Sequence, residues 1–151
     1  MRVFRSIAEM EPLVGQELAV SDWIEVTQER IRLFAEATND HQWIHLDAER
    51  AKAGPFGTTI AHGFLTLSLL PEMSASAFDV QGTRMGVNYG LNRVRFMAPV
   101  PVGSRLRARM KLVSSEAIDN QGLQMVWETT IELEGAGKPA CVAESVVRRY
   151  P

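Results

Sequence analysis

The sequence contains a single cysteine, Cys141, so no disulfide bond can form within the chain. It contains no run of about 18 apolar residues, the length that a membrane helix needs, and its first residues lack the apolar core of a signal peptide. It also lacks an excess of positive charge, because 18 acidic and 16 basic residues give a net charge of −2. We therefore expect a cytoplasmic protein that binds neither membranes nor nucleic acid.

The 151 residues show no repeat, low-complexity tract or linker, and 46% of them are hydrophobic. A chain of this length buries enough surface for a real core, so we expect one domain over residues 1–151. Its first half predicts helices: a weak one over Ile7 to Val14, one that Thr27 caps and that ends near Asn39, and one turn capped by Asp47. From Gly63 onward the run is apolar on nearly all sides, which predicts a core helix buried all round and bent or ended near Pro71.

The second half of the chain alternates apolar and polar residues, which predicts long strands. Within GVNYGLNRVRFM the apolar positions change parity, which indicates a bulge near Gly90 to Arg93. Cys141 lies in the alternating run ACVAESVV. We expect a small buried strand residue there and not a nucleophile, because thiolate activation needs nearby cationic groups.

A basic row occupies one face of the predicted strand SRLRARMKLV, where arginines and a lysine alternate with apolar residues. In LQMVWETTIELE, glutamates face away from the apolar side in the same manner. A hairpin that matches the two apolar faces, with paired residue numbers summing to about 237, sets Arg109 against Glu128 and Arg105 against Glu132. We therefore favour a neutralised, solvated sheet face over a row of cations that binds phosphate or nucleic acid.

The order of these elements predicts an α+β domain in which an antiparallel sheet wraps around a long central helix. A single sheet with one covered face leaves an open edge, and pairing with a second copy is the expected remedy. We therefore expect a homodimer.

The stretch NDHQWIHLD concentrates titratable residues directly after a predicted helix. Asp40 and His45 are five residues apart, a spacing that separates them on a helix but lets them converge if the chain curls back over a pocket. Such a pair handles protons, because histidine titrates near neutrality and a carboxylate can orient it. The spacing alone favours the alternative, an aspartate that caps a turn beside a structural histidine, so the surrounding residues must decide.

The pair His62-Gly63 begins the predicted core helix. The first N–H groups of a helix lack intrahelical partners, so a glycine there lets a substrate oxygen approach the backbone. Close packing of Gly63 against a strand explains the glycine equally well. We favour a hydrogen-bonded packing role for His62, with support of the site as the alternative.

At these residues the chain resembles a known family. The segment FAEATNDHQWIHLDAERAKAGPFGTTIAHGFLTLSLLP is similar to the signature region of the MaoC-like, (R)-specific enoyl-CoA hydratases, and within them to the nodulation protein N-like group. The resemblance extends over nearly the whole chain and implies a hotdog fold. Many members carry Asn-Pro before the catalytic histidine, where this chain has Gln42-Trp43. We expect Trp43 to take over the stiffening role of that proline by packing over the pocket mouth.

The resemblance implies hydration of a trans-2-enoyl thioester, carried by CoA or acyl carrier protein, to the (R)-3-hydroxyacyl thioester. Asp40 and His45 match the catalytic pair, and the N–H of Gly63 matches the donor to the thioester oxygen. No cofactor is implied, and the three histidines lack a recognisable metal-ligand spacing. Two alternatives remain open: a hotdog acyl-CoA thioesterase, and a non-catalytic acyl-thioester binding protein.

Overall fold

The computed structural model describes residues 1–151. The helical segments precede the long strands and are η1 (Ile7–Leu13), α1 (Gln28–Thr38), α2 (Trp43–Leu46), α3 (Ala48–Lys52), α4 (Gly63–Ser68) and α5 (Leu70–Ala77). The strands are β1 (Arg2–Phe4), β2 (Glu17–Val20), β3 (Ile24–Glu25), β4 (Phe78–Val80), β5 (Met85–Phe96), β6 (Arg105–Ala117), β7 (Leu123–Leu133) and β8 (Cys141–Tyr150). None of the helices has the length and apolar character that crossing a membrane requires.

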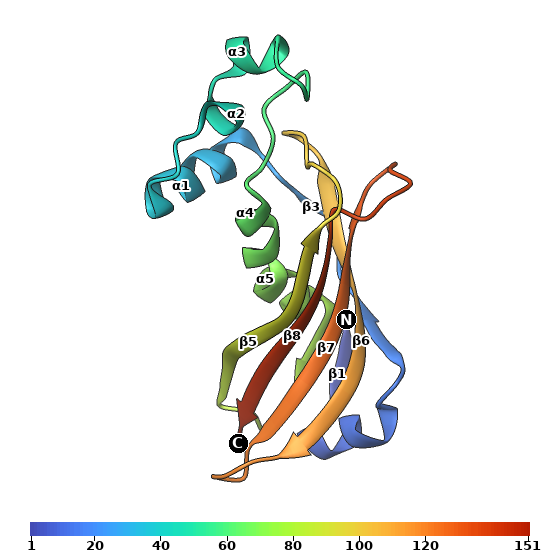
Figure 1. Cartoon of the computed structure of the whole chain (residues 1–151). Helices are drawn as coiled ribbons and strands as arrows, with labels where there is room; N and C mark the ends of the chain where they lie inside the picture. The colour runs from blue at the N-terminus through green and yellow to red at the C-terminus, as the bar shows by residue number, and fades with distance from the viewer.

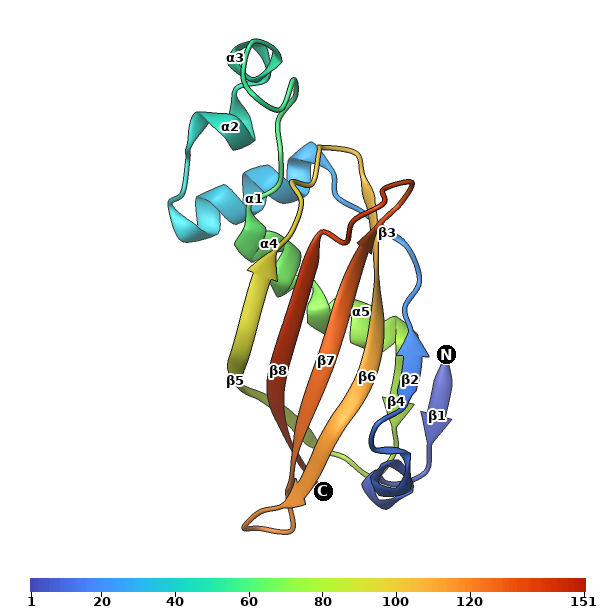
Figure 2. The same cartoon turned by 45° about the vertical axis from the view of Figure 1, so that its right-hand side comes forward.

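The main sheet is antiparallel and has six strands in the order β2-β6-β7-β8-β5, with β3 also pairing with β6. Helices α4 and α5 lie along one face of this sheet, and α1, α2 and α3 lie beyond its end (Figures 1 and 2). Strands β1 and β4 form a separate parallel pair. The predicted α+β architecture, a sheet wrapped around a central helical segment, is confirmed.

The central helical segment is interrupted near Pro71, as predicted, but its burial differs from the prediction. It is divided at Leu69 into α4 and α5, so Pro71 lies in the first turn of α5, where its missing N–H costs no hydrogen bond. Leu65, Leu69 and Met73 are buried, but 67% of the Phe64 surface is exposed. The prediction of a helix buried all round is therefore wrong for the single chain, because the sheet covers only one side of it.

The β6–β7 hairpin confirms that the basic row is neutralised. Three ion pairs cover its arginines: Arg105 with Glu134, Arg107 with Glu132, and Arg109 with Glu17 on β2. The predicted register, an odd sum near 237, is confirmed in kind, because Arg107 pairs with Glu132 and the residue numbers sum to 239. The pairs expected at 237 do not form, since Arg109 lies opposite Thr130 and Arg105 bonds to Glu134. The sum is still odd, so both apolar faces meet as predicted.

The turn between β6 and β7 explains this register. Asn120 and Gln121 adopt left-handed conformations, with φ of 60° and 58°, and the N–H of Ile118 bonds to the carbonyl of Gly122 at 2.9 Å. The turn therefore pairs residues whose numbers sum to 240. A register shift between Leu112 and Ser114 then changes the sum to 239, and a bulge of this kind leaves no alternation signal to predict it.

Strand β5 is the exposed edge of the sheet. Its pairing with β8 shifts register between Asn88 and Gly90 and again between Leu91 and Arg93, which confirms the predicted bulge. Unlike the other long strands, β5 is exposed along nearly its whole length. Cys141, at the start of β8, is fully buried, and burial raises the pKa of its thiol to about 11, which confirms an inert core residue.

The core prediction concerns Ile131, which is fully buried on β7 within the main hydrophobic cluster. Ile131→Ala should lower the free energy of unfolding by about 2 to 5 kcal/mol, because it removes buried methyl groups and leaves a cavity. Leu33→Ala on the exposed face of α1 is the control and should change it by less than about 1 kcal/mol. Urea unfolding measures both, and equal effects would contradict the described core.

Candidate active site

Asp40 is positioned by the end of α1. Thr27 caps the start of this helix by accepting a hydrogen bond from the N–H of Arg30, as predicted. At the other end, Asn39 adopts a left-handed conformation with φ of 57°, which stops the helix and turns the chain. Asp40 follows at once, and its Oδ1 accepts a hydrogen bond from the N–H of Gln42 at 3.4 Å. Its carboxylate is exposed at the helix exit.

His45 is buried in the short helix α2. Its Nδ1 lies 2.7 Å from the carbonyl oxygen of Ile60. A carbonyl only accepts hydrogen bonds, so Nδ1 carries the proton of the neutral ring and Nε2 is left as a base. Gln28 fixes the backbone here, because its Nε2 donates to the His45 carbonyl at 2.8 Å.

His62 joins the two predicted residues. Its Nε2 donates to the backbone carbonyl of Asp40 at 3.0 Å, and its ring stacks on His45 with centroids 3.7 Å apart. The Nδ1 of His62 is buried without a hydrogen-bond partner. One nitrogen of each histidine and a carboxylate oxygen of Asp40 all lie within 4.8 Å of one another. The chain therefore brings Asp40, His45 and His62 together, and His62 contributes both packing and support.

Burial controls the charge of His45. Loss of solvation lowers the pKa of its imidazole. The hydrogen bond to the Ile60 carbonyl favours the protonated form and raises the pKa, but this effect is smaller. His62 lowers this pKa further, while the carboxylate of Asp40 opposes the change. His45 is therefore neutral at neutral pH, the state in which its Nε2 accepts a proton.

Gly63 is the first residue of α4, and its N–H has no hydrogen-bond acceptor within the chain. A Cβ at this position would lie 3.0 to 3.2 Å from three ring carbons of Phe96 on β5. Close packing against Phe96 therefore accounts for the glycine. The free N–H also leaves a donor available for a ligand oxygen.

Trp43 and His41 stabilise the surrounding loops. The ring of Trp43 lies against Gly54, where an added Cβ would be 3.1 Å from it, and under the guanidinium of Arg50 at 4.3 Å. Trp43 thus connects α2 to the end of α3. Its predicted stiffening role over a pocket mouth stays a prediction. His41 bonds to Glu36 on α1 at 3.1 Å and takes no part in the cluster.

The cluster is a poor match to a metal site. A metal ligated by two histidines lies near both ring planes, in line with the nitrogen lone pairs. The rings of His45 and His62 are stacked with centroids 3.7 Å apart and 22° between their planes, so a metal ion in the plane of one ring would lie well out of the plane of the other. The absence of a metal requirement stays a prediction.

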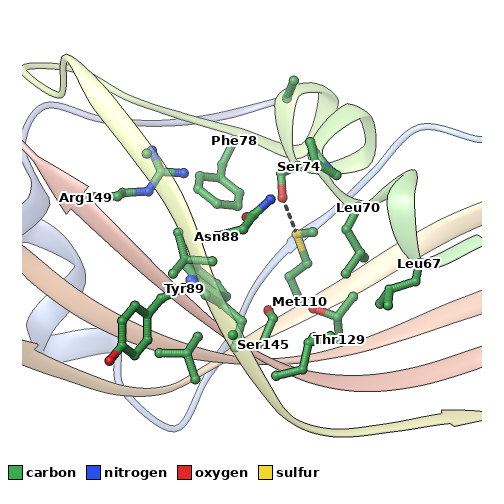
Figure 3. Close-up of a pocket in the computed structure, with 18 of the residues that line it drawn as sticks. Leu67, Leu70, Ser74, Phe78, Asn88, Tyr89, Met110, Thr129, Ser145 and Arg149 are labelled. Atoms are coloured by element: carbon green, nitrogen blue, oxygen red, sulfur yellow. Dashed lines mark hydrogen bonds between the residues drawn. The ribbon is translucent and has the colours of Figure 1, made fainter. Parts of the chain in front are cut away.

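A cavity of about 730 Å³ lies between the α4–α5 segment and strands β5 and β8 (Figure 3). None of Asp40, His45, His62 or Gly63 lines it. It begins near Leu67, one helical turn after Gly63, and extends to Phe78 and Arg149. Sequence reasoning missed this cavity and also missed Gln28, Ile60 and Phe96, because their roles depend on contacts between distant segments.

Comparison with known proteins identifies the family of the chain. Residues 9–133 match the family described as MaoC like domain. The chain is 57% identical over 148 residues to 3-hydroxyacyl-thioester dehydratase Z of Mycobacterium tuberculosis, and the match covers 98% of both chains. It is 49% identical over 140 residues to nodulation protein N of Rhizobium leguminosarum, and this match covers 91% of this chain and 87% of that protein. The (R)-hydratase of A. caviae involved in PHA biosynthesis superposes with a TM-score of 0.70 at 25% identity, covering 91% of this chain and 96% of the other.

The chain therefore belongs to the MaoC-like dehydratase family and has its hotdog fold.

The site prediction concerns the titration of His45. Burial lowers its pKa below 6.5, the ordinary value, so the folded protein binds fewer protons than the unfolded chain as pH falls through 6.5. The contribution of His45 to stability is therefore unfavourable below its folded pKa and disappears as pH rises above 6.5. A nuclear magnetic resonance titration of the imidazole should give a midpoint below 6.5, and a midpoint at or above that value would contradict the described burial.

Proposed function

We propose that the protein hydrates trans-2-enoyl thioesters to (R)-3-hydroxyacyl thioesters and catalyses the reverse dehydration. The observation that carries the proposal is that a carboxylate oxygen of Asp40 lies within 4.8 Å of a ring nitrogen of the buried His45. The Nδ1 of His45 is already hydrogen-bonded to the Ile60 carbonyl, so its Nε2 is free to act as the base. Two hydrogen bonds of about 2.8 Å reach across roughly 5.6 Å, so one water can contact groups that lie within 4.8 Å of each other. The dehydratase relatives named above support the same class of reaction.

The proton balance is simple in this arrangement. The water oxygen bonds to C3 of the enoyl group while Nε2 of His45 takes a proton from that water. Electrons move from the double bond toward the thioester carbonyl and then return as C2 gains the proton that His45 took from the water, with Asp40 assisting the delivery. The product gains OH at C3 and H at C2, and the pair returns to its starting protonation state.

The N–H of Gly63 is the proposed donor to the thioester oxygen, on which negative charge builds during the reaction. It is free within the chain and lies next to His62, which contacts both Asp40 and His45. An oxyanion donor of this kind contributes about 3 to 4 kcal/mol to transition-state stabilisation. In this proposal the thioester of CoA or acyl carrier protein is the substrate, and neither cofactor nor metal is needed.

We place the acyl chain of the substrate along α4 and in the cavity beside α5. Leu67 is one turn from Gly63, so a chain that leaves the thioester in this direction enters the cavity directly. About half of the lining is hydrophobic, 11 of 21 residues, as an acyl group requires.

We also propose a homodimer formed through β5. This strand pairs only with β8, so its other edge has free N–H and carbonyl groups. It also exposes large apolar side chains, among them Val87, Tyr89 and Leu91. A second copy that pairs with this edge would satisfy the backbone and cover the apolar surface.

The main test changes the two proposed catalytic residues without changing their size. Asp40→Asn and His45→Gln should each lower kcat for crotonyl-CoA by about a hundredfold or more, because they remove proton transfer and keep most of the packing. The double variant should be little worse than either single variant, since residues that act on one water lose their joint effect once. Loss of enoyl absorbance measures the rate, and circular dichroism confirms folding.

His41→Gln is the matched control and should cost less than about tenfold, because His41 bonds to Glu36 outside the cluster. Release of free thiol from crotonyl-CoA would indicate a thioesterase in place of a hydratase. Binding without any turnover would indicate a non-catalytic protein. Near-normal hydration by a folded Asp40→Asn variant would show that the assignment is wrong.

The oligomer prediction is a stable dimer in sedimentation at micromolar concentration. Leu91→Lys on β5 should shift the protein toward monomer, because it places a charge in the proposed interface. Leu33→Lys on the exposed face of α1 is the control and should leave the dimer intact. A wild-type monomer at this concentration would exclude the proposed assembly.

A further inference from the structure

Arg149 is a charged residue on the apolar face of the sheet. Its neighbour across the ladder is Leu123, which starts the buried row that continues through Met125 and Trp127. Arg148, one residue earlier, has the opposite orientation, bonds to Gln124 and lies over Tyr89. A positive charge that faces the wrapped side of a sheet is costly to bury unless it has a partner.

The guanidinium of Arg149 lacks such a partner within the chain. Its Nε is buried without a hydrogen bond, and it forms no ion pair. Burial lowers the pKa of this guanidinium, and the charge of Asp79 only partly opposes the effect because that side chain is exposed. The ring of Phe78 lies 5.5 Å from the guanidinium and supplies no acceptor oxygen. Arg149 thus has unused capacity to bind an oxygen ligand.

This residue lies at the far end of the cavity. Figure 3 shows Arg149 beside Phe78 on one side of the cavity and Leu67 on the opposite side, nearer Gly63. Helices α4 and α5 run from Gly63 to Ala77 along the cavity. At the rise of an α-helix these residues span roughly 22 Å, which is about the extended length of an acyl chain of 16 to 18 carbons. A chain that starts at Gly63 therefore ends near Arg149.

We infer that Arg149 is a specificity-determining residue that selects long acyl thioesters carrying a carboxylate at the end remote from the thioester. This inference rests on the proposed function, because it assumes that the thioester carbonyl binds at Gly63. The hydrophobic residues of the cavity lining contact the methylene groups, and Arg149 donates charge-assisted hydrogen bonds to the terminal carboxylate. A methyl-ended chain of the same length leaves the partly buried guanidinium, with its buried Nε, unpaired.

The test compares two CoA thioesters of equal length, the saturated 16-carbon acyl group with a terminal carboxylate and the same group with a terminal methyl. Saturated thioesters cannot be hydrated, so calorimetry measures binding without relying on the reaction. The wild-type protein should bind the carboxylate-ended thioester about tenfold more tightly. Arg149→Met should abolish or reverse this preference and keep similar side-chain volume.

Arg148→Met is the matched control, since that side chain faces away from the cavity, and it should keep the wild-type preference. Equal binding of the two thioesters by the wild-type protein, or an unchanged preference in Arg149→Met, would overturn the inference even if crotonyl-CoA is hydrated. Carboxylate preference without hydration of crotonyl-CoA would support Arg149 as the binding residue and overturn the proposed reaction alone.

Discussion

The packing of the α4–α5 segment against the sheet is the constraint on which the rest of the structure depends. Leu65, Leu69 and Met73 from this segment join a buried cluster with residues of β6, β7 and β8. Because α4 begins at Gly63, this packing also fixes His62, which precedes the helix and contacts both other members of the cluster. The hydrophobic effect thus places the polar site, although no polar residue of that site contributes much to the core.

The site combines a rigid group with an accessible one. His45 is held by its side chain through Ile60 and by its backbone through Gln28, so its ring has one orientation. Asp40 is exposed, and its backbone carbonyl is tied to His62. In the proposed reaction, such an arrangement would keep His45 fixed and neutral as the base and leave the exposed carboxylate of Asp40 accessible to substrate. Preorganisation of this kind removes the entropic cost of assembling the reacting groups.

The same wrapped sheet explains the cavity and the exposed edge. Strand β5 carries two register shifts, and its exposed residues form the outer wall of the space beside α4 and α5. A second copy placed on β5 would enclose that space, which connects the proposed dimer to the proposed acyl site. In that proposed assembly Arg149 would lie at the end of the enclosed cavity remote from Gly63, where a charge without an ion-pair partner would discriminate between ligand ends.

The sequence by itself determined the fold class, the capped helix α1, the neutralised basic row and the choice of Asp40 and His45 as a candidate pair. Each of these depends on local periodicity, on spacing or on a resemblance in contiguous residues. It did not determine the hairpin register, which a left-handed turn at Asn120 and a bulge after Leu112 set together. Nor did it reveal the Ile60 carbonyl that orients His45, the contact of Phe96 with Gly63, or the inward orientation of Arg149 in a cavity. These features join segments far apart in the chain, and only tertiary packing brings such segments into contact.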